Sequence, residues 1–217
     1  MIIPPRYNGP PESANGGYAC GLLSEALGGG FEVMLRRPPP LGVNLDLVGT
    51  ELRQGDVVIA EARRAESLLE ASPPVSLAEA EEASRGYPGF AHHAYPTCFT
   101  CGPARKDGLG IFAGPVAGRD GLVAAPWTPA EVRPELVWAA LDCPSGWAVD
   151  DFQREGVVLG RMAAGIHELP RVGEPHVVVG WPVGEESRKR HAGSALYTAA
   201  GGLLAVARST WLVPAPE

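Results

Sequence analysis

The feature that most constrains this sequence is an order of predicted elements that occurs twice. In each half, apolar residues at helical spacing are followed by a Pro-containing turn and a β-branched strand, at 39–49 and again at 170–180. A second apolar segment follows each strand, at 57–63 and 203–208, and the connection at 181–202 makes the second repeat longer. The repeat therefore predicts two units, each a helix followed by antiparallel strands.

Neither a helix nor a sheet can bury its apolar face alone, so each predicted helix needs a sheet that wraps it. We therefore predict an α+β fold with two central helices, each wrapped by an antiparallel sheet. The residues with helical spacing are Tyr18, Leu22 and Ala26 in the first half and Leu136, Ala140, Cys143 and Trp147 in the second.

The segment between the repeats is predicted to be a linker with one short surface helix. Ser76 is a suitable N-cap, and Glu79 three residues later completes a capping box. Residues 109–112 and 122–125, on either side of a Gly-rich turn, are predicted to form the opening hairpin of the second unit. The expected division is an N-terminal unit with linker at 1–90 and a C-terminal unit at 91–217.

Composition limits the partners that such a chain can have. Hydrophobic residues make up 45% and charged residues 20% of the 217 residues, which is typical of a folded globular protein. The net charge of -7 disfavours nucleic acid and anionic membranes as partners, and no apolar run reaches the roughly 18 residues of a membrane span. With no basic and apolar signal segment at its start, the chain is expected to be cytoplasmic.

This chain lacks the sequence motifs of several enzyme classes. There is no Gly-x-Ser-x-Gly nucleophile elbow, no Gly-x-Gly-x-x-Gly after a predicted strand, and no Walker loop. These absences argue against an elbow-type serine hydrolase, hydride transfer and phosphoryl transfer.

Three segments of the chain resemble one known superfamily. Residues 9–18, GPPESANGGY, lead into a helix of small residues, and LRRPPPL at 35–41 has the character of a strand and turn after it. With WAALDCP at 138–144, they resemble the hotdog-fold acyl-CoA thioesterase superfamily over most of the chain. The resemblance implies a tandem double hotdog in which an acyl thioester is held between two units.

The resemblance also implies where a thioester carbonyl would be held. In such thioesterases a backbone N–H at the start of the central helix polarises the carbonyl, because first-turn amides have no intrahelical partner and the helix dipole favours an oxyanion. Asn15-Gly16-Gly17 occupies that place, which makes the Gly17 amide the expected donor. The alternative interpretation is an ordinary helix start with Asn15 as N-cap.

A thioesterase of this kind also needs a carboxylate as base or nucleophile. In the superfamily this acid lies about two helical turns after the second glycine, which corresponds to Ser24 and Glu25 in the first half. The second half has Asp142 within an apolar helix but no glycines at the start of that helix. The halves are thus complementary, and we expect the Gly17 amide and the Asp142 carboxylate to face each other across a cleft, about 6–10 Å apart. Alternatively, Asp142 only supports a helix kink before Pro144.

Cys98 and Cys101 form a C-x-x-C motif followed by Gly102, as in a zinc knuckle. A tetrahedral zinc site needs two more ligands, and His92 or His93 could help only if the chain folds back. Without a second C-x-x-C, we expect no metal and a buried pair of thiols. The loop after Gly102 also lacks the strand-to-helix junction of a thioredoxin-type redox site.

The predicted function is hydrolysis or binding of an acyl thioester, with coenzyme A thioester as substrate and no other cofactor. Basic residues that could meet its phosphates lie at 188–191 and 105–106, although such runs are usually solvated. The alternative is a non-catalytic protein that binds acyl-CoA or a small acyl ligand. No Asp is followed by a His five residues later, which argues against a hotdog hydratase. We expect a homo-oligomer. The sequence does not determine which acyl group is bound.

Overall fold

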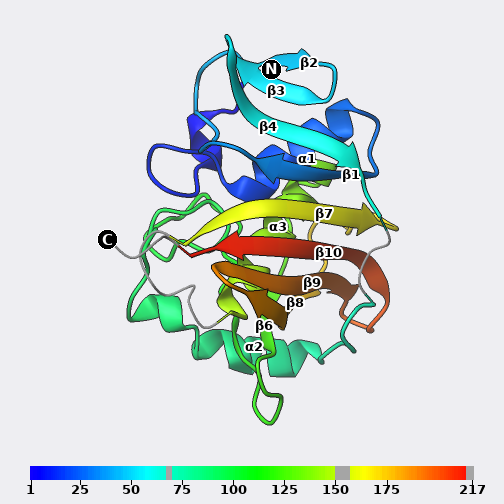
Figure 1. The fold of residues 1–217 in the computed structure, drawn as a ribbon. Coiled ribbons are helices and arrows are strands. Elements are labelled where there is room, and N and C mark those ends of the chain that lie inside the picture. Colours follow the sequence, from blue (N-terminus) through cyan, green and yellow to red (C-terminus); the bar gives the residue numbers. More distant parts are fainter. Residues whose placement is uncertain (67–69, 150–156, 214–217) are drawn as a thin grey trace.

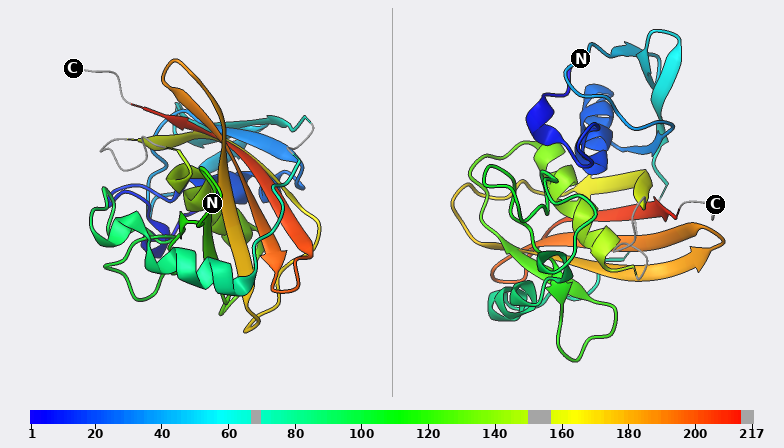
Figure 2. Two further views of the ribbon diagram at one scale, coloured as in Figure 1. Left: turned by 90° about the horizontal axis from the view of Figure 1, so that it is seen from below. Right: turned by 90° about the vertical axis from the view of Figure 1, so that its left-hand side faces the viewer.

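The computed structural model describes residues 1–66, 70–149 and 157–213 and shows one antiparallel sheet with two buried helices on one of its faces (Figures 1 and 2). In the described part of the chain the sheet has ten strands in the order β2-β3-β4-β1-β7-β10-β9-β8-β6-β5. The strands are β1 Phe31–Leu35, β2 Asp46–Val48, β3 Glu51–Gln54, β4 Val57–Arg64, β5 Gly114–Pro115, β6 Val123–Trp127, β7 Val158–Ile166, β8 His176–Glu186, β9 Lys189–Thr198 and β10 Leu203–Leu212. The helices are α1 Gly16–Ala26, α2 Leu77–Arg85 and α3 Pro134–Trp147, with short 3-10 turns at Pro5–Tyr7 and Pro88–Phe90.

Both predicted central helices are confirmed. Asn15 caps α1, since its side-chain Oδ1 accepts a hydrogen bond from the Tyr18 amide at 2.9 Å. The N-cap interpretation of Asn15 is therefore correct.

Helix α3 begins with Pro134, whose missing N–H costs nothing in the first turn, and it continues past Pro144 to Trp147.

The two helices cross at close range and run antiparallel. A Cβ atom at Gly17 would lie 2.6 Å from both the Asp142 Cβ and the Trp138 carbonyl oxygen, whereas one at Gly21 would approach Trp138 and Glu135. Later residues of α1 therefore lie beside earlier residues of α3, as in an antiparallel pair. Glycine at these two positions removes the side chains that would hold the helix backbones apart.

The two sets of strands meet where β1 pairs antiparallel with β7, with Val33 opposite Met162. Glu32, one residue earlier on β1, is buried, and three arginines from different strands surround its carboxylate. Its oxygens accept hydrogen bonds from Arg63 at 2.8 Å, Arg208 at 2.9 Å and Arg161 at 3.4 Å. This ion-pair cluster joins β1 to β4, β7 and β10.

The linker helix α2 covers the opposite face of the sheet from α3. Its predicted capping box is present, with Ser76 and Glu79 exchanging hydrogen bonds. Along β8, Val177 and Val179 join the cluster of buried residues under α2, whereas Val178 joins the main core beneath α3. Successive side chains of a strand point to opposite faces, which explains why this run is apolar without alternation.

The predicted strands are correct in outline but incomplete. Residues 109–112 are not a strand, because the partner that pairs with β6 begins later, at Gly114. The connection predicted at 181–202 holds β9, which lies between β8 and β10 and pairs with both. Two strands have no counterpart in the prediction: β3, between the two apolar segments of the first half, and β7, which pairs with β1 and β10. Among the described residues, the helices are all too short or too polar to cross a membrane.

Candidate active site

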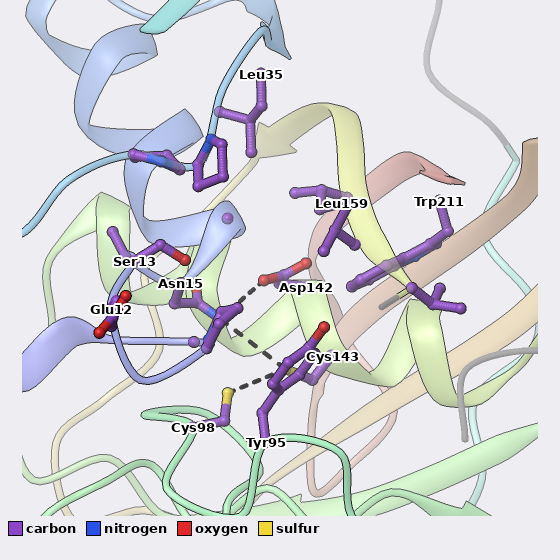
Figure 3. Close-up of a pocket in the computed structure, with 18 of the residues that line it drawn as sticks. Glu12, Ser13, Asn15, Leu35, Tyr95, Cys98, Asp142, Cys143, Leu159 and Trp211 are labelled. Carbon is purple, nitrogen blue, oxygen red and sulfur yellow. Dashed lines mark hydrogen bonds between the residues drawn. The ribbon is translucent and has the colours of Figure 1, made fainter. Parts of the chain in front are cut away.

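A cavity of about 810 Å³ opens at the N-terminal end of α1. It is bounded by the loop before α1, the turn after β1, the C-x-x-C loop and the ends of β7 and β10, and Asp142 and Cys143 of α3 also line it (Figure 3). Elements from both halves of the chain therefore form one cavity, of a size typical for a small-molecule site.

Asp142 is the acidic group that α3 presents to this cavity. Its side chain is buried, and one carboxylate oxygen, Oδ2, accepts hydrogen bonds from the Asn15 side-chain amide at 2.8 Å and from the Gly17 backbone amide at 2.9 Å. The other oxygen, Oδ1, is buried without a hydrogen-bond partner among the described residues. Oδ1 is therefore free to accept a hydrogen bond.

The surroundings of Asp142 act on its pKa in opposite directions. Burial raises the pKa, the hydrogen bond from the Gly17 amide lowers it, nearby Cys98 raises it and the Asn15 amide lowers it, with a resulting value of about 7. Burial is the dominant cause. A carboxyl group with such a pKa can both accept and release a proton near neutral pH.

The structure corrects the expected arrangement of Gly17 and Asp142. They do lie together although 125 residues separate them, but the carboxylate contacts the Gly17 amide directly instead of facing it across a cleft of 6–10 Å. The reason is the close helix crossing, which leaves no room for a side chain at Gly17. The Gly17 N–H is therefore already occupied in this structure.

Two other predicted positions lie apart from the cavity. Glu25 is exposed near the C-terminal end of α1 and does not line the cavity, because it is on the far part of the helix from Asn15. Ser24 beside it is buried, and its hydroxyl has no hydrogen-bond partner in the described residues. Of the two candidate acids, only Asp142 is at the cavity.

The C-x-x-C thiols also reach this cavity. Cys98 and Cys101 are buried and in contact with a third thiol, Cys143 of α3, with 3.7 Å between the Cys98 and Cys143 sulfurs. His93 does fold back, and its Nε2 lies 3.4 Å from the Cys101 sulfur. Cys143 was not predicted as a site residue, because its helical spacing assigns it to an apolar helix face; its place next to Asp142 was the available signal.

The predicted basic runs are placed away from the cavity lining. Arg105 is engaged with Asp107, Asn8 and the Thr97 carbonyl, which makes it a support for the C-x-x-C loop. Residues 188–191 lie at the β8–β9 hairpin tip. The arginines that do line the cavity are Arg36, paired with Glu61, and the exposed Arg37, for which the described residues offer no ion-pair partner.

Comparison with known proteins identifies the fold. No family description and no curated protein matches this sequence. Several solved structures match almost the whole chain. They include a protein from Novosphingobium aromaticivorans DSM 12444 described as a "putative thioesterase" (TM-score 0.64, 11% identity, 99% of this chain and 94% of that one), a tesB protein from Mycobacterium avium subs paratuberculosis (0.57, 13%, 99% and 91%), and a conserved protein with hot dog fold from Alicyclobacillus acidocaldarius (0.58, 11%, 98% and 91%).

These similarities establish the fold of the chain. The chain has the hotdog fold, as the sequence predicted, and its structural neighbours are thioesterase-superfamily and hotdog-fold proteins. Identities of 11–13% establish the fold alone, so activity has to be argued from the cavity.

Proposed function

We propose that this protein hydrolyses an acyl-CoA thioester in the cavity at the start of α1, with Asp142 as the general base. One observation carries the proposal: a buried carboxylate lines the cavity, and one of its oxygens is held by two N–H donors while the other has no partner in the described structure. Asn15 and Gly17 fix the orientation of the carboxylate. Oδ1 is left to bind a water molecule.

The reaction requires one proton transfer to Asp142 and one to the leaving group. Water bound at Oδ1 attacks the thioester carbonyl carbon as its proton passes to the carboxylate. The carbon–sulfur bond then breaks, and the coenzyme A sulfur leaves as a thiolate that takes up a proton. A pKa of about 7 suits a group that must hold a proton briefly and release it.

The carbonyl oxygen also needs a hydrogen-bond donor, and the Gly17 amide is occupied by Asp142. Gly16 is the first residue of α1 and lines the cavity, and its amide belongs to the first turn, which has no acceptor within the helix. We assign the role expected of Gly17 to the Gly16 amide. The positive end of the helix dipole supports the developing oxyanion there.

The phosphates of coenzyme A need cations at the cavity rim. Arg37 is exposed, lines the cavity and has no ion-pair partner in the described part of the chain, so its guanidinium is available to a phosphate. Arg36 beside it is paired with Glu61. Arg37 is therefore assigned to phosphate binding in place of the two basic runs.

The proposed architecture behind this site is a tandem double hotdog. The helix start comes from the N-terminal unit and the acid from the C-terminal unit, which supports one site shared by two fused units. The boundary at residue 90 stays a prediction; α2, which precedes that boundary, packs against β6 and β8 of the second half.

A second candidate function is binding without turnover. The hydrogen bond between Gly17 and Asp142 favours it, because a group already satisfied by Asp142 gives nothing to a substrate carbonyl. In that case the cavity would hold an acyl-CoA or a small acyl ligand unchanged.

Measuring the release of free thiol from a panel of acyl-CoAs, beside a thermal-shift screen with the same compounds, separates the two functions. Hydrolysis predicts saturable thiol release with at least one acyl chain length. Stabilisation by an acyl-CoA without thiol release would select the binding protein, since a ligand that binds only the folded state raises its melting temperature. If no acyl-CoA is hydrolysed and none stabilises the protein, both acyl-CoA hydrolysis and acyl-CoA binding are contradicted.

A further inference from the structure

Three thiols from two distant segments meet at the inner wall of the cavity. The sulfurs of Cys98, Cys101 and Cys143 all lie within 4.8 Å of one another, and all three side chains are buried and reduced. Cys98 and Cys101 come from a loop, whereas Cys143 comes from α3, 42 residues after Cys101. Figure 3 shows Cys98 and Cys143 facing each other beside Asn15 and Asp142.

The loop that carries Cys98 and Cys101 is a tight turn. The Gly102 amide donates to the Cys98 carbonyl at 2.9 Å, and a Cβ atom at Gly102 would lie only 2.5 Å from the Cys98 nitrogen. Thr100 anchors the turn to α3 by donating its hydroxyl to the Ala139 carbonyl at 3.0 Å. The turn is thereby held one helical turn from Cys143, which lies on the same side of α3.

Hydrogen-bond donors surround the sulfurs. The Cys98 and Cys143 thiols are within hydrogen-bond distance of each other, with 3.7 Å between their sulfurs. The Asn15 amide nitrogen lies 4.0 Å from the Cys143 sulfur. Such donors stabilise negative charge on sulfur, which is the form that binds a metal.

His93 stands at the edge of the cluster in a defined tautomer. Its Nδ1 accepts a hydrogen bond from the Tyr95 amide at 2.9 Å, so in the neutral ring the proton is on Nε2. The Nε2–H then points at the Cys101 sulfur, 3.4 Å away. In this arrangement His93 supports a Cys101 thiolate as a hydrogen-bond donor and has no lone pair to offer a metal.

The spacing of the three sulfurs fits a tetrahedral zinc site. A zinc–sulfur bond of about 2.3 Å in a tetrahedral site sets neighbouring sulfurs about 3.8 Å apart. The Cys98 and Cys143 sulfurs are 3.7 Å apart, and the others are close enough for a single ion. Soft thiolate ligands select zinc over magnesium or calcium.

In place of the metal-free pair of thiols expected from the sequence, we propose that Cys98, Cys101 and Cys143 bind one zinc ion as three thiolates, with the fourth position of the ion facing the cavity. Each thiol gives its proton to solvent as the ion binds. The ion would fasten the C-x-x-C loop to α3 beside Asp142. This inference concerns metal content and is independent of whether the protein hydrolyses thioesters.

The direct test is the metal content of the full chain, purified without chelators or a histidine tag. We expect one zinc per chain by elemental analysis, and thiolate-to-metal charge-transfer absorption after cobalt replaces zinc. Cys143→Ser should lose most of the zinc, whereas Cys20→Ser should keep it, because Cys20 is a buried thiol of α1 outside the cluster. His93→Gln should keep the zinc as well.

Several outcomes would overturn the proposal. Wild-type protein that contains no zinc and takes up neither zinc nor cobalt has no such site, whatever the stability of the variants. Iron in place of zinc, or a disulfide among these three cysteines found by mass spectrometry after alkylation, would equally rule it out. Loss of zinc in His93→Gln would contradict the open fourth position by making His93 the fourth ligand.

Discussion

At the scale of single residues, the site depends on one oxygen atom of Asp142. Two N–H donors saturate Oδ2, and Oδ1 is buried without a described partner. The two donors fix the orientation of the carboxylate, and Asp142 is at the same time a lining residue of the cavity.

Arg37 gives the first prediction at this scale. Arg37→Gln should raise KM for the acyl-CoA that is hydrolysed by about tenfold, because losing one charge-assisted hydrogen bond to phosphate costs about 1.5 kcal/mol. The KM for the same acyl group on pantetheine, which has no phosphate, should not change. Arg188→Gln at the hairpin tip is the matched control. An equal rise in the KM of Arg37→Gln for acyl-CoA and for acyl-pantetheine would show that Arg37 does not bind phosphate.

At the scale of elements, the start of α1 combines a helix cap with the orientation of the acid. Asn15 accepts from the Tyr18 amide through Oδ1 and donates to Asp142 through Nδ2. A substitution of Asn15 therefore removes the helix cap and the contact with Asp142 together. Ser76, which caps α2 and is not among the residues that line the cavity, allows the effect of losing a cap alone to be measured.

Asn15→Ala should lower the free energy of unfolding by about 1 kcal/mol through loss of the cap and should also reduce kcat, because Asp142 loses one of its two donors. Ser76→Ala should have a similar cost in stability, about 1 kcal/mol, with kcat unchanged. Urea unfolding and thiol-release kinetics on both variants provide the comparison. A kcat for Asn15→Ala equal to that of Ser76→Ala would remove Asn15 from the site.

The sequence predicted the elements that local patterns determine. Apolar residues at helical spacing located α1 and α3, and the Ser76–Glu79 capping box located α2. It did not predict β9, because this strand begins with basic residues, although most of its later side chains are buried and it pairs with both β8 and β10. Local patterns carry no information on such pairing.

The candidate site shows the same limit. The chemistry of Asp142 and Asn15 was predicted from residue type and position, but their direct contact and the occupied Gly17 amide depend on how closely two helices cross. Cys143 joins Cys98 and Cys101 only through the same tertiary packing. Spacing in sequence could not show a third thiol so far from the C-x-x-C motif.

At the scale of the whole molecule, the Glu32 cluster holds the two sets of strands together across β1 and β7. Burial raises the pKa of Glu32, but the hydrogen bond from Arg63 and the charges of Arg161, Arg63 and Arg208 outweigh it, so that the pKa lies below its ordinary value of 4.5. A carboxylate of this kind stabilises the fold above its unfolded-state pKa, and the contribution is lost as pH falls through the lower, folded-state pKa.

Glu32→Gln should therefore lower the free energy of unfolding by about 1.5–3 kcal/mol at pH 7, the usual cost of losing hydrogen bonds to a buried charged group. The difference from wild type should shrink as pH falls below about 4.5, where the unfolded-state carboxylate takes up its proton. Glu61→Gln, which removes a surface ion pair with Arg36, should cost at most about 1 kcal/mol. Chemical unfolding at pH 7 and pH 4 is the measurement, and a difference for Glu32→Gln that does not depend on pH would contradict the role given to its charge.

The expected homo-oligomer also belongs to this scale and stays a prediction. Strands β2 and β5 are the two ends of the described sheet, and each leaves one edge without a neighbouring strand. Unpaired strand edges are surfaces on which chains can associate.

The hydrolysis rate of Asp142→Asn, measured beside that of Glu25→Gln, tests the proposed role of Asp142 most directly. Asparagine keeps a carbonyl oxygen that can accept from Asn15 and Gly17, so the fold should be retained, and removing a buried charge should not lower the melting temperature. We predict that kcat/KM for acyl-CoA falls by about 10²–10⁴ in Asp142→Asn and is unchanged in Glu25→Gln. Full thiol release by Asp142→Asn, or its loss in Glu25→Gln alone, would contradict the assignment of Asp142 as the base.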